Sequence, residues 1–313
     1  MTDNLRGILA VLASSTTFVV SDAIVKLIAA RLPASEIIVV RGAMATVLLA
    51  LGARLLGGWR PVSILLQPMM LLRILSAGAA SCLVVLSLRD LPLANVNAVL
   101  QMTPLAVTAG AAIVYGERVG PSRWLAALIG FVGVLLIVKP GSSIFGAAAF
   151  TVLIALIFTT TRDLTTRGLS RDIPAMFVGA ASACAISLSG LVIVPFDAPW
   201  VMPGAKDWQL MGISAVLLFF GNTLLITALR TGEIGVVAPF RYAPVPLSLG
   251  LGYLWWGDVP DALAVVGIVM VLSAGLALLF SERQSLRARK PKPPERTAHE
   301  PQAQPDEGED RTR

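Results

Sequence analysis

The chain has 313 residues, of which 56% are hydrophobic and 14% are charged, and its net charge is +6. Because a soluble domain carries about 25% charged residues, a soluble protein of this composition could not cover its surface with polar groups. The basic residues lie at the ends of apolar segments and in one cluster after the last of them. This distribution indicates an integral membrane protein and argues against a nucleic-acid-binding one.

Ten apolar segments follow one another with short connections, many of which contain proline. A bilayer span needs about 20 mostly apolar residues, and no segment alternates with the period of two that marks the strands of a membrane barrel. We therefore predict an all-α integral membrane protein with ten transmembrane helices. The predicted helices cover residues 7–30, 35–56, 69–88, 93–115, 122–138, 146–168, 174–194, 208–229, 235–256 and 261–280.

The first apolar segment also resembles a signal peptide, because Arg6 precedes an apolar core that leads to the small residues Ser21 and Ala23. Its counterpart in the second half of the chain, around residues 148–171, is internal and cannot be a signal. We therefore interpret the first segment as a transmembrane helix.

The distribution of Lys and Arg predicts the orientation in the membrane. With the N-terminus inside, the cytoplasmic connections carry most of the basic residues, including Arg54, Arg60 and the cluster at 283–292. Both termini are therefore expected in the cytoplasm of a bacterial cell, with the spans in the inner membrane. Residues 282–313 are rich in Pro, Glu, Arg and Gln, and we expect a disordered cytoplasmic tail.

Several landmarks recur at one offset, which indicates an internal duplication. Tyr115-Gly116-Glu117 and Trp256-Gly257-Asp258 lie 141 positions apart, and both close an apolar segment. Four more pairs share this offset: Asp22 and Asp163, Lys26 and Arg167, Pro33 and Pro174, and Arg89 and Arg230. We predict one five-helix repeat at 5–140 and a second at 146–281. Because five is odd, the second repeat must be inverted in the membrane, as in many transporters.

The two Gly-acid endings have a structural interpretation. Gly116 and Gly257 can end helices in the left-handed conformation. Glu117 and Asp258 would then lie at the surface near the start of the next helix, where the helix dipole favours an acid.

Together with Pro104 and Pro244 in the fourth and ninth segments and the glycine-rich fifth helix (Gly130 and Gly133), this arrangement resembles the EamA-type carriers of the drug/metabolite transporter superfamily. The resemblance covers about residues 5–280 and implies transport, with substrates as varied as amino acids, nucleotides, vitamins and drugs. Asp258 departs from the family's usual Glu, and Pro244 lies one position from the counterpart of Pro104.

Ionisable residues inside predicted spans are functional candidates, because they are costly in lipid. Asp22 and Lys26 share a helix face, and Arg41 enters the second helix at a similar depth of roughly 12 Å. In the second repeat, Asp163 and Arg167 take the matching positions, and Arg241 lies at the depth of Asp163. We expect an acid–base set near each mouth of the carrier, acting as gates; fixed structural pairing is the alternative. Proton coupling through Asp22, exchange and simple facilitation all stay open.

Polar residues concentrate in the fourth and ninth helices, which prolines interrupt. Such helices border the midplane site of inverted-repeat carriers, whereas the alternative is that the amides hold helices together. An aromatic cavity residue would suit a flat cargo. The candidates for the cavity wall are Asn95, Asn97, Gln101, Thr103, Ser81, Asn222, Phe240 and Tyr242.

The sequence lacks the features of the competing functions. Cys82 and Cys184 lie in apolar stretches and the single histidine, His299, lies in the tail, so we expect no metal, no cofactor and no enzyme. A phosphate-binding loop is also missing, which excludes an ATP-driven pump for this chain alone. The prediction is a secondary transporter of a small metabolite, by alternating access. Riboflavin uptake is favoured through similarity to bacterial riboflavin carriers, and export of amino acids, amines or drugs is the alternative. A membrane assembly or sensor subunit and a homodimer are left open.

Overall fold

The computed structural model describes residues 3–116, 120–138, 147–170, 172–231 and 238–288. Within these ranges the chain forms helices and connections, without a strand. Seven of the described helices are long and apolar enough to cross a membrane, and two shorter apolar helices cover 124–138 and 262–278. The interrupted segment 238–256 completes ten spans, which confirms the all-α, ten-helix prediction.

The first repeat contains α1 (Asp3–Ala29), α2 (Ala34–Leu55), the short helix η1 (Val62–Leu66), α3 (Pro68–Asp90), α4 (Leu93–Leu100), α5 (Thr103–Tyr115) and α6 (Pro121–Val138). The second contains α7 (Ala147–Arg167), α8 (Ala175–Ile193), η2 (Val194–Phe196), α9 (Ala205–Thr231), η3 (Ala238–Tyr242), α11 (Pro244–Trp256) and α12 (Ala262–Ala288). Because α12 runs to Ala288, residues 282–288 of the predicted tail are helical. The rest of that tail lies outside the described residues.

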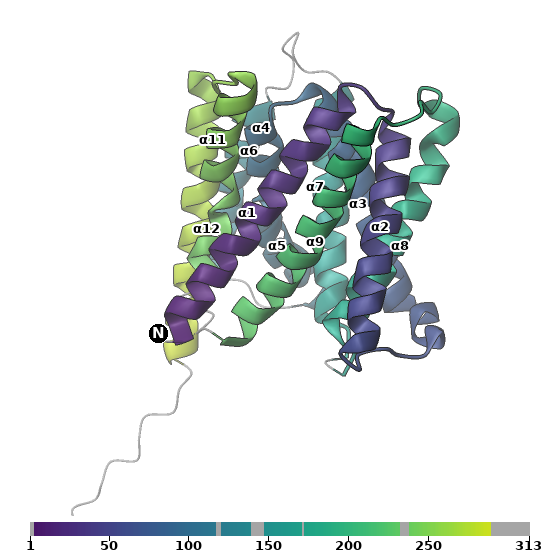
Figure 1. Ribbon diagram of the computed structural model, residues 1–313. Coiled ribbons are helices and arrows are strands. Elements are labelled where there is room, and N and C mark those ends of the chain that lie inside the picture. Colours follow the sequence, from purple (N-terminus) through teal and green to yellow (C-terminus); the bar gives the residue numbers. More distant parts are fainter. Residues whose placement is uncertain (1–2, 117–119, 139–146, 171, 232–237, 289–313) are drawn as a thin grey trace, which may run out of the picture.

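The packing of the helices shows the inverted duplication. The first helix of one repeat packs along the third helix of the other, so that α1 lies beside α9 and α3 lies beside α7 (Figure 1). The second helices, α2 and α8, pack on each other, and so do the fifth helices, α6 and α12. A two-fold axis in the membrane plane produces this reciprocal pattern.

The fifth helices meet backbone to backbone. A Cβ atom on Gly267 would lie 2.5 Å from the carbonyl oxygen of Gly133, and one on Gly133 would lie 2.8 Å from that of Gly267. The positions related to these two by the repeat, Ala126 and Ala274, are also small and buried. Small residues at helix interfaces allow this close approach in membranes.

The fourth span of each repeat is interrupted, as the prolines predict. The first interruption is the Gln101-Met102 turn between α4 and α5, and the second is η3 with Ala243 before α11. Pro104 and Pro244 lie in the first turn of the following helix, where the missing N–H costs no hydrogen bond. At the far ends, Gly116 and Gly257 adopt φ values of 64° and 68° and end α5 and α11 in the left-handed conformation.

The hydrophobic core runs through both repeats, and α1 is part of it. Val25 and Ile28 are fully buried, as are Ile37 in α2 and Leu88 in α3. The helix packs along α9, which is expected of the first span of a repeat rather than of a signal peptide.

Candidate functional site

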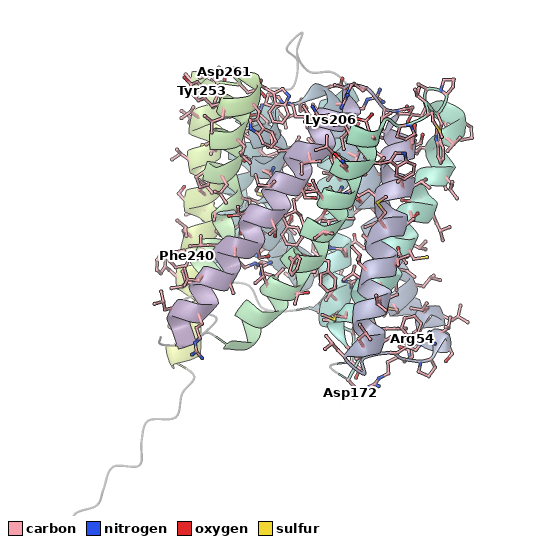
Figure 2. The ribbon with its side chains drawn as sticks, in the orientation of Figure 1. Arg54, Asp172, Lys206, Phe240, Tyr253 and Asp261 are labelled. Atoms are coloured by element: carbon pink, nitrogen blue, oxygen red, sulfur yellow. The ribbon has the colours of Figure 1, made fainter. Side chains whose placement is uncertain are left out.

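Two sets of charged and hydroxyl side chains lie inside the bundle, near opposite ends. We define the two ends by residues visible in Figure 2: Arg54 and Asp172 lie at the N-terminal face, where α1 begins, and Lys206 and Asp261 lie at the opposite face. The sets occupy repeat-related positions, 141 residues apart. The Asp22 quartet consists of Ser21, Asp22, Arg41 and Ser214, and the Asp163 quartet consists of Arg162, Asp163, Ser182 and Arg73.

The Asp22 quartet joins α1, α2 and α9. The guanidinium of Arg41 donates through Nη2 to the hydroxyl of Ser21 at 2.9 Å, and the Ser21 and Ser214 hydroxyls are 2.7 Å apart. Arg41 is 8% exposed, and its Nε is buried without a hydrogen-bond partner. A buried guanidinium therefore keeps one donor unused.

Asp22 is half-buried, and its charge interacts with that of Arg41. Among the described residues, however, it has neither a hydrogen bond nor an ion pair within 4.0 Å. The structure thus places the two groups within electrostatic reach of each other without direct contact. A charge inside the bundle normally has a hydrogen-bonded partner, so the lack of one at Asp22 is unusual.

Lys26 lies one turn beyond Asp22 and has different partners. Its Nζ donates to the carbonyl oxygen of Leu91 at 2.7 Å, lies 3.5 Å from Oδ2 of Asp258, and stands 5.3 Å from the centre of the Trp256 ring. Lys26 therefore links α1 to the α3–α4 connection and to the end of α11. The sequence predicted only a surface position for Asp258 and not its ion pair with Lys26, although the predicted topology puts both residues near the same membrane face.

Each charged side chain of the Asp163 quartet has a hydrogen-bond partner. Oδ1 of Asp163 accepts from Nε of Arg162 at 2.9 Å, and Nη2 of Arg162 lies 2.8 Å from the same oxygen. Arg73 donates from Nε to the hydroxyl of Thr166 at 2.9 Å and from Nη1 to the hydroxyl of Ser182. Asp163 lies about four residues from the end of α7, whereas Asp22 lies about seven from the end of α1, or roughly 6 and 10 Å. The two acids are therefore not equally deep.

The predicted partners of Asp163 need correction. The side chain of Arg241 is exposed, and the side chain of Arg167 lies outside the described part of the structure. Arg241 does not reach Asp163 because η3 packs beside α1 and α12, whereas α7 packs along α3. Sequence reasoning missed Arg73 and Arg162. The repeat offset held a signal for both, because it pairs Arg73 with Ser214 and Arg162 with Ser21.

Several predicted cavity residues close hydrogen bonds on their own helices instead. Asn97 donates to the carbonyl of Leu93 at 3.1 Å, and Asn222 donates to that of Leu218 at 2.8 Å. Thr103 donates to the carbonyl of Leu100. Ser81 is half-buried on α3 and has no hydrogen-bond partner among the described residues. These side chains therefore offer few free groups to a substrate.

Two predicted residues keep a more distinctive place. The side-chain amide of Gln101, at the first interruption, donates to the carbonyl oxygen of Arg241 at the second interruption, at 2.8 Å. The broken spans of the two repeats are thereby tied to each other. The side-chain oxygen of Asn95 is buried without a partner, and Asn95 lines a cavity of about 350 Å³ between α4, α6, α7 and α12 near the opposite face.

The two aromatic candidates do not form a stacking site. Tyr242 is 6% exposed, and its hydroxyl packs so tightly on Gly275 of α12 that a Cβ atom there would overlap it. Phe240 is 37% exposed, and Figure 2 shows it at the edge of the bundle. The basis for predicting a flat aromatic cargo is therefore missing. Within the described residues, no group of three or more His, Cys, Asp or Glu side chains could hold a metal ion.

Comparisons with known proteins agree with this architecture. The chain is 30% identical over 281 residues to the pseudopaline exporter CntI of Pseudomonas aeruginosa (strain UCBPP-PA14), and the match covers 87% of this chain and 95% of that protein. It is 29% identical over 195 residues to the riboflavin transporter of Vibrio cholerae serotype O1, with 61% of this chain and 64% of the relative covered. An S-adenosylmethionine uptake transporter of Rickettsia prowazekii is 23% identical, and the match covers 63% of this chain and 67% of that protein.

A crystal structure of a protein with 17% sequence identity superposes with a TM-score of 0.61, over 90% of this chain and 98% of that one. At this identity the likeness shows the fold alone. The model of the EamA-like transporter family matches residues 5–139. With inverted five-helix repeats and transporters as relatives, the protein is a small-metabolite transporter of the membrane. The chain belongs to the EamA-like transporter family.

Proposed function

We propose that this protein is a secondary carrier that exports a small polar metabolite across the bacterial inner membrane by alternating access. The observation that supports this most strongly is the pair of repeat-related acid–base quartets near opposite faces. In an inverted-repeat carrier, the two repeats exchange conformations when access switches from one face to the other. Groups at repeat-related positions would then meet the substrate in turn.

The contacts between the repeats are consistent with a state closed at the opposite face. Three ion pairs there join one repeat to the other: Lys26 with Asp258 at 3.5 Å, Arg31 with Asp207 at 2.6 Å and Arg89 with Asp197 at 3.3 Å. With the N-terminus in the cytoplasm, as the Lys and Arg distribution predicts, the closed face is the outer one. The carrier would then be poised to accept cargo from inside.

Export of a polar cargo is supported over riboflavin uptake by two observations. The Pseudomonas aeruginosa relative, an exporter, matches over 87% of the chain, whereas the riboflavin transporter matches over 61%. Two aromatic residues were expected to stack on a flat vitamin. Tyr242 instead packs against α12, and Phe240 lies at the edge of the bundle. Riboflavin uptake remains the second candidate, on the strength of that relative.

The proposal is tested by expressing the protein in a bacterium that lacks its own copy and comparing the metabolites in the medium by mass spectrometry. We expect at least one polar metabolite to accumulate outside several-fold faster with the protein than with an empty vector. A parallel arm uses a riboflavin auxotroph at low riboflavin. Growth rescue there, with an unchanged medium in the first arm, would contradict export and support uptake.

A further inference from the structure

We propose that Asp22 and Arg41 together bind a zwitterionic substrate, one that carries both an amine and a carboxylate, with Arg41 holding the carboxylate and Asp22 the amine. This inference rests on the proposed transport function and names the class of its cargo. It is carried by the geometry of the Asp22 quartet.

Arg41 offers the carboxylate a partly formed site. One nitrogen, Nη2, is fixed by the Ser21 hydroxyl, and that hydroxyl is fixed in turn by Ser214. The guanidinium is therefore held in one orientation while its Nε stays buried without a partner. Guanidinium groups recognise carboxylates through two parallel N–H donors. A carboxylate on the Nε edge would satisfy the unused donor.

Asp22 offers the complementary charge. Its half-buried carboxylate feels the charge of Arg41 but touches no cation among the described residues, because Lys26, one turn away, is engaged by Asp258, Leu91 and Trp256. An ammonium group beside Asp22 would supply the hydrogen bonds that this carboxylate lacks. The site as a whole carries no net charge, as a zwitterion does, so binding would leave no uncompensated charge in the membrane.

The Asp163 quartet shows an acid with a direct partner at the related place of the same fold. Asp163 is in direct contact with Arg162, and Arg73 is held by two hydroxyls. If Asp22 and Arg41 served only to neutralise each other, the same direct contact would be expected. Asp22 and Arg41 instead lack a direct contact among the described residues, so both groups keep hydrogen-bonding capacity for a ligand.

The experiment measures thermal unfolding of the purified full-length protein in detergent, with each of the twenty standard amino acids and with riboflavin. Every amino acid that stabilises the protein is then compared with two matched analogues. The amide analogue keeps only the amine, and the deaminated acid keeps only the carboxylate. We expect at least one amino acid to raise the melting temperature in a concentration-dependent way. Its two analogues should bind about tenfold or more weakly, because each loses one charge-assisted contact.

Variants separate a binding role from a structural one. Arg41→Lys keeps the charge but removes the Nε edge, and Asp22→Asn keeps the shape but removes the charge. Each variant should bind the stabilising amino acid about tenfold more weakly. Asp22→Glu is the second acid variant if Asp22→Asn fails to fold. Arg54→Gln, which changes an exposed arginine at the N-terminal face, is the control and should leave binding unchanged.

Each outcome has a defined meaning. Stabilisation by an amide or a deaminated acid equal to that by its amino acid would overturn the inference, and so would stabilisation by no amino acid at all. If cells expressing the protein nevertheless release a metabolite, the transport proposal stands and only the zwitterion site fails. If release is also absent, the proposed function fails with it.

Discussion

The two quartets occupy equivalent places in an inverted duplication, yet they hold their charges differently. In the Asp22 quartet one acid and one base lie near each other without contact, and the base keeps a buried unused donor. In the Asp163 quartet the acid is in contact with Arg162, and Arg73 donates to the hydroxyls of Thr166 and Ser182. The two quartets have arginine and serine exchanged between related positions. As a result, the Asp22 quartet keeps unused hydrogen-bonding groups, whereas the charged side chains of the Asp163 quartet all have partners.

Repeat symmetry therefore determines where polar groups lie but not which partners they have. Arg41 and Ser182 are related by the repeat, and so are Ser214 and Arg73. Moving the cation from the second helix to the third brings it beside Thr166 and Ser182, which satisfy it. The Asp22 quartet, near the opposite face, is therefore the better candidate for contact with cargo.

The largest effect is expected when the arginine of each quartet is replaced. Arg41→Gln would remove a buried guanidinium with its hydrogen bond to Ser21 and leave Asp22 without a nearby counter-charge, so we expect a loss of about 1.5–3 kcal/mol of unfolding free energy. Arg73→Gln should cost far less, because Asp163 keeps Arg162 at 2.8 Å. Thermal or denaturant unfolding of the two purified variants measures the difference. Equal destabilisation would mean that the two quartets are held alike.

A moderate effect is expected at the closed face. Lys26→Met removes an ion pair, a hydrogen bond and a contact with the Trp256 ring, so we expect a loss of about 1–2 kcal/mol of unfolding free energy. Arg31→Gln, on a side chain that is 51% exposed, should cost less than about 1 kcal/mol. A double-mutant cycle of Lys26→Met with Asp258→Asn isolates the ion pair. A coupling energy of zero would show that Asp258 contributes nothing through Lys26.

A smaller effect depends on pH and concerns the connection after η2. Burial alone would raise the pKa of Asp197, but hydrogen bonds from the backbone N–H groups of Ser35 and Ala198 and the charge of Arg89 outweigh it and hold that pKa below its ordinary value of 3.8. The stabilisation is therefore fully present above pH 3.8, and it is lost as the pH falls through the lower folded-state pKa.

Melting temperatures measured from about pH 6 to about pH 3 test this expectation. The gap between the natural protein and Asp197→Asn should narrow on acidification, because the variant has no carboxylate to protonate. A gap that stays constant, or widens, would contradict the assignment of the shift to Asp197.

The smallest expected effect sharpens the choice of cargo. Phe240→Leu changes a side chain at the bundle edge, so transport should stay within about twofold of the natural protein, as for most surface substitutions. Gly275→Ala is its contrast, because the added methyl would collide with the hydroxyl of Tyr242. Transport assays on both variants test this. A loss of activity in Phe240→Leu alone would restore the aromatic-cargo hypothesis.

Much of the fold followed from local patterns in the sequence. Apolar length predicts the spans, because lipid requires about 20 apolar residues, and the odd number of helices per repeat predicts the inversion. Gly116 and Gly257 predict helix ends, and Pro104 and Pro244 predict the interruptions, because these residues constrain their own backbone. The nearness of Asp22 and Arg41 was also predictable, since sequence-adjacent helices with a short connection lie side by side.

Contacts between distant helices could only be decided by the tertiary structure. Helical periodicity places a residue on a face of its helix, but it does not say which helix of the other repeat covers that face. For this reason a partner of Asp163 was predicted on the ninth span, whereas Asp163 contacts Arg162 on its own helix and lies near Arg73 of α3. Likewise, Lys26 was not paired with Asp258, and Tyr242 was expected to face a cavity instead of Gly275. The sequence determined the helices, their inversion and the charges they carry; packing across the repeats determined which of those charges remain open to a substrate.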